Sequence, residues 1–158
     1  MNVYIAYDRY EHDEWYSVYN IETNKQRAIK HFKEEDLPSF ISYGPDDCHS
    51  FQLQRVVMTA KQYHRLCYLV ENEGSHTCDT SDELKDLLMS IFDENDFEVD
   101  TLMSTDGCSD IWDLVRYYCE RNGGDCENDD DFEKAQEELF NNDELFENVL
   151  KEYIKIAY

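Results

Sequence analysis

The sequence predicts an α+β protein, in which a small antiparallel β-sheet with covering helices is followed by a mainly helical, acidic half. The first half contains short runs rich in β-branched and aromatic residues, separated by segments with helical periodicity. The second half contains mostly helical stripes of apolar residues. Charge divides the chain at the same place: residues 1–74 carry twelve Asp and Glu against eight Lys and Arg, and residues 75–158 carry twenty-five against six.

Three strands and two helices are expected in the first half, in the order β-β-α-β-α. The strands are predicted at residues 3–7, 16–21 and 51–58, where β-branched and aromatic residues alternate or cluster. We expect the first half to bury its apolar side chains in one core. These side chains are Ile5, Val18, Phe32, Leu53, Val57 and Leu66.

Two capping-box pairs predict where the helices of the first half begin. Thr23 with Gln26 is expected to start a helix that ends at Leu37–Pro38, because the residue before proline is disfavoured in the α region. Thr59 with Gln62 is expected to start the second helix. Its apolar stripe consists of Tyr63, Leu66, Cys67 and Val70.

The second half is expected to be mainly helical. Thr80 with Glu83 predicts the start of one helix, and Ser109 predicts the N-cap of another. Between them, residues 97–103 alternate as a fourth strand would. Two acidic helices then end the sequence. The chain is predicted to divide into a sheet domain at 1–74 and an acidic helical part at 80–158, or to form one merged domain.

The most acidic stretch covers residues 125–147 and holds eleven carboxylates against a single base, Lys134. A run this acidic is often a disordered tail, but here apolar residues recur between the charges at helical spacing. We therefore expect the carboxylates to lie on the outside of folded helices, as candidate partner-binding residues. They are Asp125, Glu127, Asp129, Asp130, Asp131, Glu133, Glu137, Glu138, Asp143, Glu144 and Glu147.

The composition excludes several kinds of partner. The acidic half would repel the phosphates of a nucleic acid, whereas a basic protein surface would be attracted to it. No run approaches the ~18 apolar residues of a membrane span, and no signal peptide is recognisable, so we expect a cytosolic protein without a membrane partner. The six cysteines contain no C-x-x-C pair, which is typical of reduced thiols in the cytosol.

The sequence predicts no calcium or zinc site. An EF-hand loop starting at Asp125 would have Asp130 in place of its glycine and Gln136 in place of its glutamate, although loose cation binding at 129–131 stays an alternative. Cys67 falls within a helical apolar stripe, which favours a packed thiol over a metal ligand. The residues considered for zinc are His64, Cys67, His76 and Cys78.

No pattern predicts an enzyme. Cys48 and His49 are the only pair that suggests nucleophilic catalysis, and adjacent residues rarely point toward one another. The sequence contains no glycine-rich phosphate-binding loop, no G-x-S-x-G and no H-E-x-x-H. We expect no catalytic residues and no cofactor.

Tyrosines crowd the first two predicted strands. Tyr4, Tyr7, Tyr16 and Tyr19 fall within them and Tyr10 lies between them, and alternation distributes tyrosines over both faces of a sheet. They are interpreted either as core packing or as a tyrosine-rich contact surface for another protein.

In its size, its charge segregation and its lack of catalytic motifs, the chain resembles small acidic inhibitors encoded by phages and mobile elements, above all anti-CRISPR proteins and other DNA mimics. Residues 3–15, VYIAYDRYEHDEW, add to this resemblance. The resemblance implies a stoichiometric binder of a nucleic-acid-handling protein, for example a Cas effector, a restriction enzyme or RNA polymerase. It carries no motif from which functional residues could be transferred.

The predicted function is therefore inhibition of a nucleic-acid-binding host defence protein, by an acidic surface that competes for a channel lined with Lys and Arg. Carboxylates on a helix recur every ~5–6 Å, so two such helices approach the charge density of DNA. The alternative is a non-enzymatic adaptor that binds another protein through the tyrosine-rich sheet. A metal-dependent or cysteine enzyme is the third interpretation.

Overall fold

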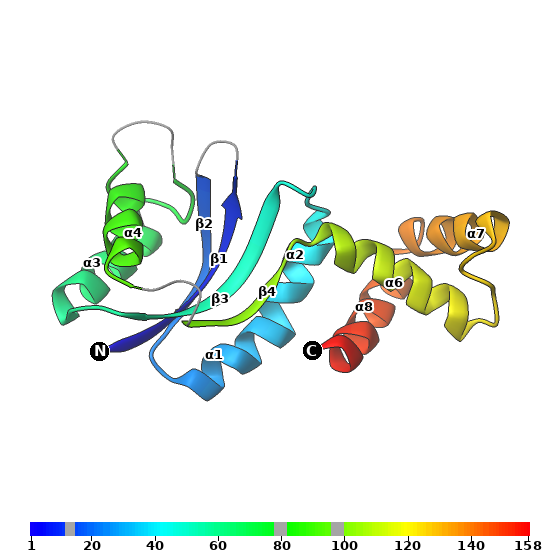
Figure 1. Cartoon of the computed structure of the whole chain (residues 1–158), viewed down its shortest axis with the longest axis horizontal. Coiled ribbons are helices and arrows are strands. Elements are labelled where there is room, and N and C mark those ends of the chain that lie inside the picture. The colour runs from blue at the N-terminus through cyan, green and yellow to red at the C-terminus, as the bar shows by residue number, and fades with distance from the viewer. Residues whose placement is uncertain (12–14, 78–81, 96–99) are drawn as a thin grey trace.

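The computed structural model describes residues 1–11, 15–77, 82–95 and 100–158. It confirms the predicted α+β class, with a four-stranded antiparallel sheet followed by a mostly helical second half (Figure 1). The strands are β1 (Asn2–Tyr10), β2 (Trp15–Glu22), β3 (His49–Val57) and β4 (Thr101–Thr105), arranged in the order β2-β1-β3-β4. The helices are α1 (Lys25–His31), the π-helical segment η1 (Phe32–Asp36), α2 (Leu37–Tyr43), α3 (Ala60–Asn72), α4 (Glu83–Asp93), α6 (Cys108–Arg121), α7 (Asp129–Phe140) and α8 (Asp143–Ala157).

The expectation of a single core in the first half is wrong, because helices cover both faces of the sheet. Ile5, Val18 and Leu66 pack on the face covered by α3 and α4. Phe32 and Leu53 pack on the opposite face, in a cluster that continues into α6, α7 and α8. Alternation along a strand sends neighbouring side chains to opposite faces, so a strand covered on both sides supplies two cores. Val57, at the end of β3, is 51% exposed.

The segment 25–43 departs from its prediction at both ends. Asn24, not Thr23, is the N-cap of α1, and its side chain accepts a hydrogen bond from the backbone N–H of Arg27. The helix also does not end at Leu37–Pro38. The π-helical segment η1 leads into α2, where Pro38 occupies the first turn and its missing N–H costs no helical hydrogen bond. Gly44, with φ 70°, ends α2.

Of the stripe predicted for α3, Leu66 is buried and the other three residues are partly buried, while Leu69, which the prediction did not include, is buried. The caps of the helices after β3 also differ in part from the prediction. The capping box of Thr59 and Gln62 is confirmed at α3. Asp82 caps α4 by accepting from two backbone N–H groups, and Thr80 lies outside the described residues. Ser109 is not the N-cap of α6, which starts after Gly107. The first apolar positions of the predicted strand 97–103 also lie outside the described residues, and β4 begins at 101.

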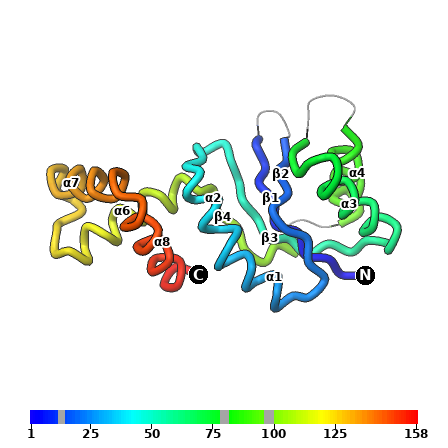
Figure 2. Tube along the Cα trace, turned by 180° about the vertical axis from the view of Figure 1, so that it is seen from behind, coloured from blue at the N-terminus to red at the C-terminus, as the bar shows by residue number. Residues whose placement is uncertain are grey.

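Helices α6, α7 and α8 form a lobe beside the sheet, and α7 lies at the end of the molecule's long axis (Figures 1 and 2). Both α6 and α8 contact α2, which joins the lobe to the sheet. The sheet itself draws on both halves of the sequence, because β4 pairs with β3 and α4 packs against α3. The division into 1–74 and 80–158 stays a prediction. Among the described residues, no helix is both long and apolar enough to cross a membrane.

Candidate functional site

The acidic stretch folds as the periodicity predicts. Asn128 caps α7 by accepting from the backbone N–H of Asp131, and Asn142 caps α8 in the same way through Leu145. Ala135 and Leu139 are buried on the inner side of α7. All eleven candidate carboxylates of residues 125–147 are exposed.

These carboxylates have no ion-pair partner in the part of the chain that the structure describes. None of the eleven lies within 4.0 Å of a Lys, Arg or described His nitrogen. Three of them instead accept hydrogen bonds from other groups of the lobe, and Asp125 does so from the backbone N–H of Glu127 at 3.0 Å. Asp131 accepts from the backbone N–H of Asp125 at 2.9 Å, and Glu138 accepts from the hydroxyl of Tyr118 at 2.9 Å.

The remaining carboxylates of α7 form an outer row, which we define as Asp129, Asp130, Glu133 and Glu137. At ~100° per residue these four positions fall within an arc of ~100°, on the side away from the buried residues of the helix. The six carboxylates of α7 occupy twelve residues, or ~18 Å of helix, which is one per ~3 Å. One strand of DNA carries a charge every ~3.4 Å.

Helix termini account for part of this acidity without any partner. Asp129, Asp130 and Asp131 lie in the first turn of α7, and Asp143 and Glu144 lie in the first turn of α8. Negative charge at a helix N-terminus is stabilised by the helix dipole, typically by about 0.3–1 kcal/mol where the site is exposed and salt is low. Glu133 and Glu137 lie beyond that turn, so the dipole does not explain them.

Three of the five tyrosines considered for a contact surface are buried. Tyr4, Tyr7 and Tyr16 are 7%, 2% and 5% exposed, because helices cover both faces of the sheet. Burial raises the pKa of the Tyr7 hydroxyl, which donates to the side-chain carbonyl of Gln52 at 2.8 Å. These three tyrosines therefore pack the two cores, and the remaining two, Tyr10 and Tyr19, line a pocket.

This pocket, which we call the sheet-end pocket, has a volume of about 360 Å³. Strand register assembles its floor, since Asp8 on β1 lies opposite Ser17 on β2, and Tyr10 lies opposite both Trp15 and His49. Ser39 and Tyr43 on α2, together with His76, complete the described walls.

A β-bulge adds Tyr19 to the same pocket. The register of β1 with β2 shifts between Ala6 and Tyr7, which leaves Tyr19 as an extra residue without a register partner. Burial raises the pKa of its hydroxyl to about 12. Bulges re-aim side chains and are common beside functional sites.

A buried carboxylate and imidazole lie at the base of the sheet-end pocket. Asp8 is 6% exposed and His49 is 8% exposed, and the Nδ1 of His49 lies 2.9 and 3.0 Å from the two carboxylate oxygens of Asp8. Burial raises the pKa of the Asp8 carboxyl, and the hydrogen bond from His49 opposes that rise. The Nε2 of His49 lies 3.9 Å from a carboxylate oxygen of Asp46. Sequence reasoning singled out His49 beside Cys48 but missed its partner, which is 41 residues away.

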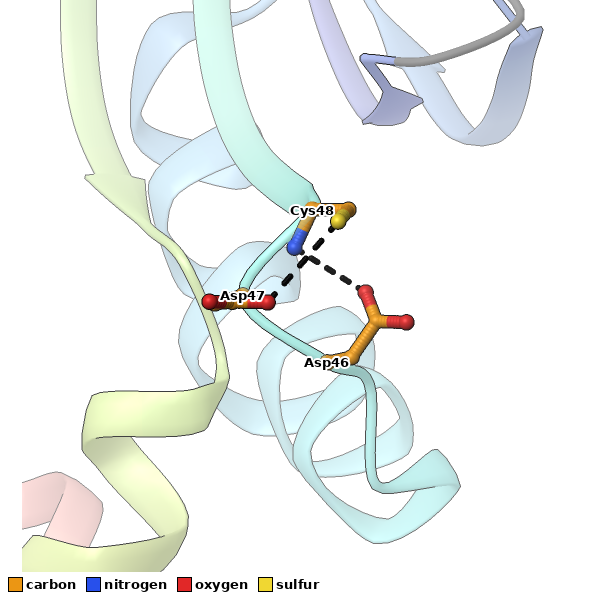
Figure 3. A group of neighbouring side chains, drawn as sticks. All are labelled: Asp46, Asp47 and Cys48. Carbon is orange, nitrogen blue, oxygen red and sulfur yellow. Dashed lines mark hydrogen bonds between the residues drawn. The ribbon is translucent and has the colours of Figure 1, made fainter.

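The surroundings of Cys48 do not activate its thiol. Figure 3 shows Cys48 with the two aspartates before it, where its backbone N–H donates to Asp46 at 3.0 Å as in an Asx turn. Its thiol lies 3.8 Å from a carboxylate oxygen of Asp47. Desolvation and these two carboxylates raise the pKa of the Cys48 thiol, which is the direction opposite to that of an activated nucleophile.

The residues considered for zinc are not brought together where they are described. His64 lies beside the ring of Tyr63, and His76 hydrogen-bonds with the hydroxyl of Ser17 at 2.6 Å. Cys78 lies outside the described residues. Within the described ranges, the one group of three close ligand types is Asp46, Asp47 and Cys48, and it does not include the carboxylates at 129–131.

Among the described candidates, the chain thus presents two features that could bind a partner: the outer row of carboxylates on α7 and the sheet-end pocket. Their chemistry differs, because the first is an exposed charged surface and the second is an aromatic cavity with a buried carboxylate. No protein-family model, no curated protein and no solved structure matches this chain.

Proposed function

We propose that the protein is a stoichiometric inhibitor of a nucleic-acid-binding protein, and that α7 occupies a channel lined with Lys and Arg. The target class suggested by the resemblance to phage-encoded inhibitors is a host defence protein, such as a Cas effector. The observation that carries the proposal is the outer row of α7, whose exposed carboxylates have no ion-pair partner among the described residues. The six carboxylates of α7 together lie at one per ~3 Å of helix, which is close to the spacing of phosphates along one strand of DNA.

Position supports the same proposal. α7 lies at one end of the molecule (Figures 1 and 2), so that it can enter a channel before the sheet meets the channel rim. The folded helix holds its charges in place before binding. Little conformational entropy is therefore lost when the partner is met, in contrast to a disordered acidic tail.

No described base of the lobe lies within 4.0 Å of an outer-row carboxylate, and this includes Lys134, which lies on α7 itself. Arg116 pairs with Asp113, and Arg121 pairs with Glu152, away from the outer row. Lys151 and Lys155 line a groove with Lys33, between α8 and the segment formed by η1 and α2. A target surface rich in Lys and Arg would supply the missing countercharge.

The test compares two variants with the same net charge. The first neutralises the outer row through Asp129→Asn, Asp130→Asn, Glu133→Gln and Glu137→Gln. Its matched control neutralises four exposed carboxylates on α3, α4 and the turn after α3. The control substitutions are Glu71→Gln, Glu73→Gln, Asp86→Asn and Asp93→Asn. Asp131 and Glu138 stay unchanged in both, because their hydrogen bonds hold the lobe together.

Partners would first be isolated at low salt from a host lysate, with DNA or RNA as the eluting competitor. We expect the outer-row variant to lose most of its association rate with the isolated partner, and the control to keep it, since steering depends on where the charge lies. Binding of the wild type should weaken as ionic strength rises, because the Debye length falls from ~10 Å at 0.1 M to ~3 Å at 1 M. Equal binding by both variants, or a partner that DNA or RNA does not displace, would refute the proposal.

A further inference from the structure

The sheet-end pocket is large enough to hold a small molecule. Its volume of about 360 Å³ falls in the range of ~300–1,000 Å³ that is usual for ligand pockets. It lies on a rigid frame, because its floor is formed by three hydrogen-bonded strands. Its rim carries Trp15 and Tyr43, which are 42% and 62% exposed and come from different elements.

The walls of the pocket favour positive charge. Four aromatic rings line it, and the ring face carries negative potential that attracts cations. The buried carboxylate of Asp8 lies among them, and no Lys or Arg is present among the described lining residues. The net charge of −23 further concentrates cations and repels anions.

We propose that the sheet-end pocket binds an organic cation, namely a substituted ammonium or a guanidinium group. Asp8 uses both carboxylate oxygens toward Nδ1 of His49, yet each oxygen keeps a lone pair that can accept a further N–H or face a charged methylammonium. The rings of Tyr10, Trp15, Tyr19 and Tyr43 then surround the charge. This site is separate from the outer row of α7, and the proposal does not depend on the proposed inhibitory function.

Trp15 provides an intrinsic reporter for the test. The second tryptophan, Trp112, stacks on Phe132 in the lobe, so a Trp112→Phe variant leaves Trp15 as the only indole. Fluorescence of this variant would be titrated with choline and with its neutral isostere 3,3-dimethylbutan-1-ol. We expect saturable quenching or enhancement with choline and none with the alcohol. Equal responses would show that the pocket selects shape alone and would overturn the proposal.

Substitutions in the same background locate the binding. Tyr43→Leu removes an exposed ring and should weaken choline binding by about 2- to 30-fold, the range expected for one cation–π contact. Tyr68→Leu is the matched control, because Tyr68 is equally a surface tyrosine but lies on α3, and its affinity should equal that of the parent. Asp8→Asn should weaken choline binding further. If the Asp8→Asn variant fails to fold, the affinity of Tyr43→Leu alone tests the site. An unchanged affinity in Tyr43→Leu would refute the site.

The source of the cation is distinguished with a second pair of probes. Agmatine presents a free guanidinium, whereas the blocked peptide acetyl-Gly-Arg-Gly-amide presents the same group as a side chain. If agmatine and the peptide both bind, and both bind more weakly to Tyr43→Leu, the pocket recognises an arginine side chain on another protein. If only agmatine binds, the pocket recognises a free metabolite. Binding of neither, together with no response to choline, overturns the proposal.

Discussion

Asp110 shows how a single buried charge ties the lobe to the sheet. It is 4% exposed and accepts hydrogen bonds from the hydroxyls of Tyr153 at 2.8 Å and Tyr158 at 2.8 Å, and from the hydroxyl of Thr105. These donors come from β4, α8 and the chain end after α8. Burial, together with the Asp110 carboxylate, raises the pKa of both tyrosine hydroxyls, which keeps them protonated as donors. A buried carboxylate is tolerated because its lone pairs are satisfied.

Replacing Asp110 should therefore be costly. Asp110→Ala leaves the hydroxyls of Tyr153, Tyr158 and Thr105 without their acceptor, and a buried unsatisfied polar group costs about 1–3 kcal/mol. We expect a marked fall in the urea midpoint of this variant and a smaller fall for Tyr153→Phe, which removes one donor and lowers the free energy of unfolding by about 1 kcal/mol. Asp113→Ala is the control, because Asp113 is half exposed and pairs only with Arg116. Equal midpoints for the Asp110 and Asp113 variants would show that the buried cluster does not hold the lobe.

Two other buried carboxyls predict a pH dependence of stability. Burial raises the pKa of Asp8 and of Asp36, against the hydrogen bonds from His49 and His31. Because the folded state then holds the proton more tightly than the unfolded state, each carboxyl contributes stability below its unfolded pKa of ~3.9. That contribution is lost as pH rises through the raised folded pKa.

Asp8→Asn and Asp36→Asn should remove this dependence. As pH rises from about 4 to about 7, the urea midpoint of each variant should improve relative to that of the wild type. Val57→Ala is a non-titrating control at an exposed position, and its difference from the wild type should be constant. A constant difference for both Asn variants would contradict the assigned pKa directions.

At the scale of elements, periodicity predicted the interiors of helices and strands better than their ends. The capping box of α3 is confirmed, because it depends on two residues only three positions apart. The sequence predicts the N-cap of a helix less well where two residues that could serve as the cap are adjacent. Asn24 is the N-cap of α1 in place of the predicted Thr23. The N-cap is the residue whose side chain reaches the free N–H groups of the first turn, and in this helix that side chain belongs to Asn24. The π-helical passage to Pro38 depends on tertiary packing that no local pattern contains.

The two candidate sites also differ in how far the sequence predicted them. The exposure of the eleven carboxylates follows from apolar spacing, and sequence reasoning predicted it. The sheet-end pocket depends on strand register, on the bulge at Tyr19 and on α2 reaching Tyr43, which was expected to be in a loop. Its buried pair joins Asp8 to His49 across two strands. Only the folded chain brings these residues together.

At the scale of the whole molecule, repulsion between like charges opposes the packing of the lobe on the sheet. Residues 106–158 carry sixteen carboxylates against five bases, a net charge of −11, so the lobe repels itself and the sheet. One apolar cluster opposes this repulsion, because it runs from Phe51 on the sheet through Phe32 and Phe40 to Leu114 and Val149 in the lobe. The lobe therefore has no core of its own that is separate from the sheet.

This shared core predicts one cooperative unfolding transition for the whole chain, in place of separate transitions for 1–74 and 80–158. Trp15 on β2 reports on the sheet and Trp112 on α6 reports on the lobe, so Trp15→Phe and Trp112→Phe each leave one reporter. We expect the two fluorescence transitions in urea to coincide with each other and with far-ultraviolet circular dichroism, which is the test of two-state behaviour. Added salt should raise all midpoints together, because it screens the self-repulsion of the lobe. An earlier transition for Trp112 alone, or preferential proteolytic cleavage near Gly74 under native conditions, would instead show that the chain divides into two domains.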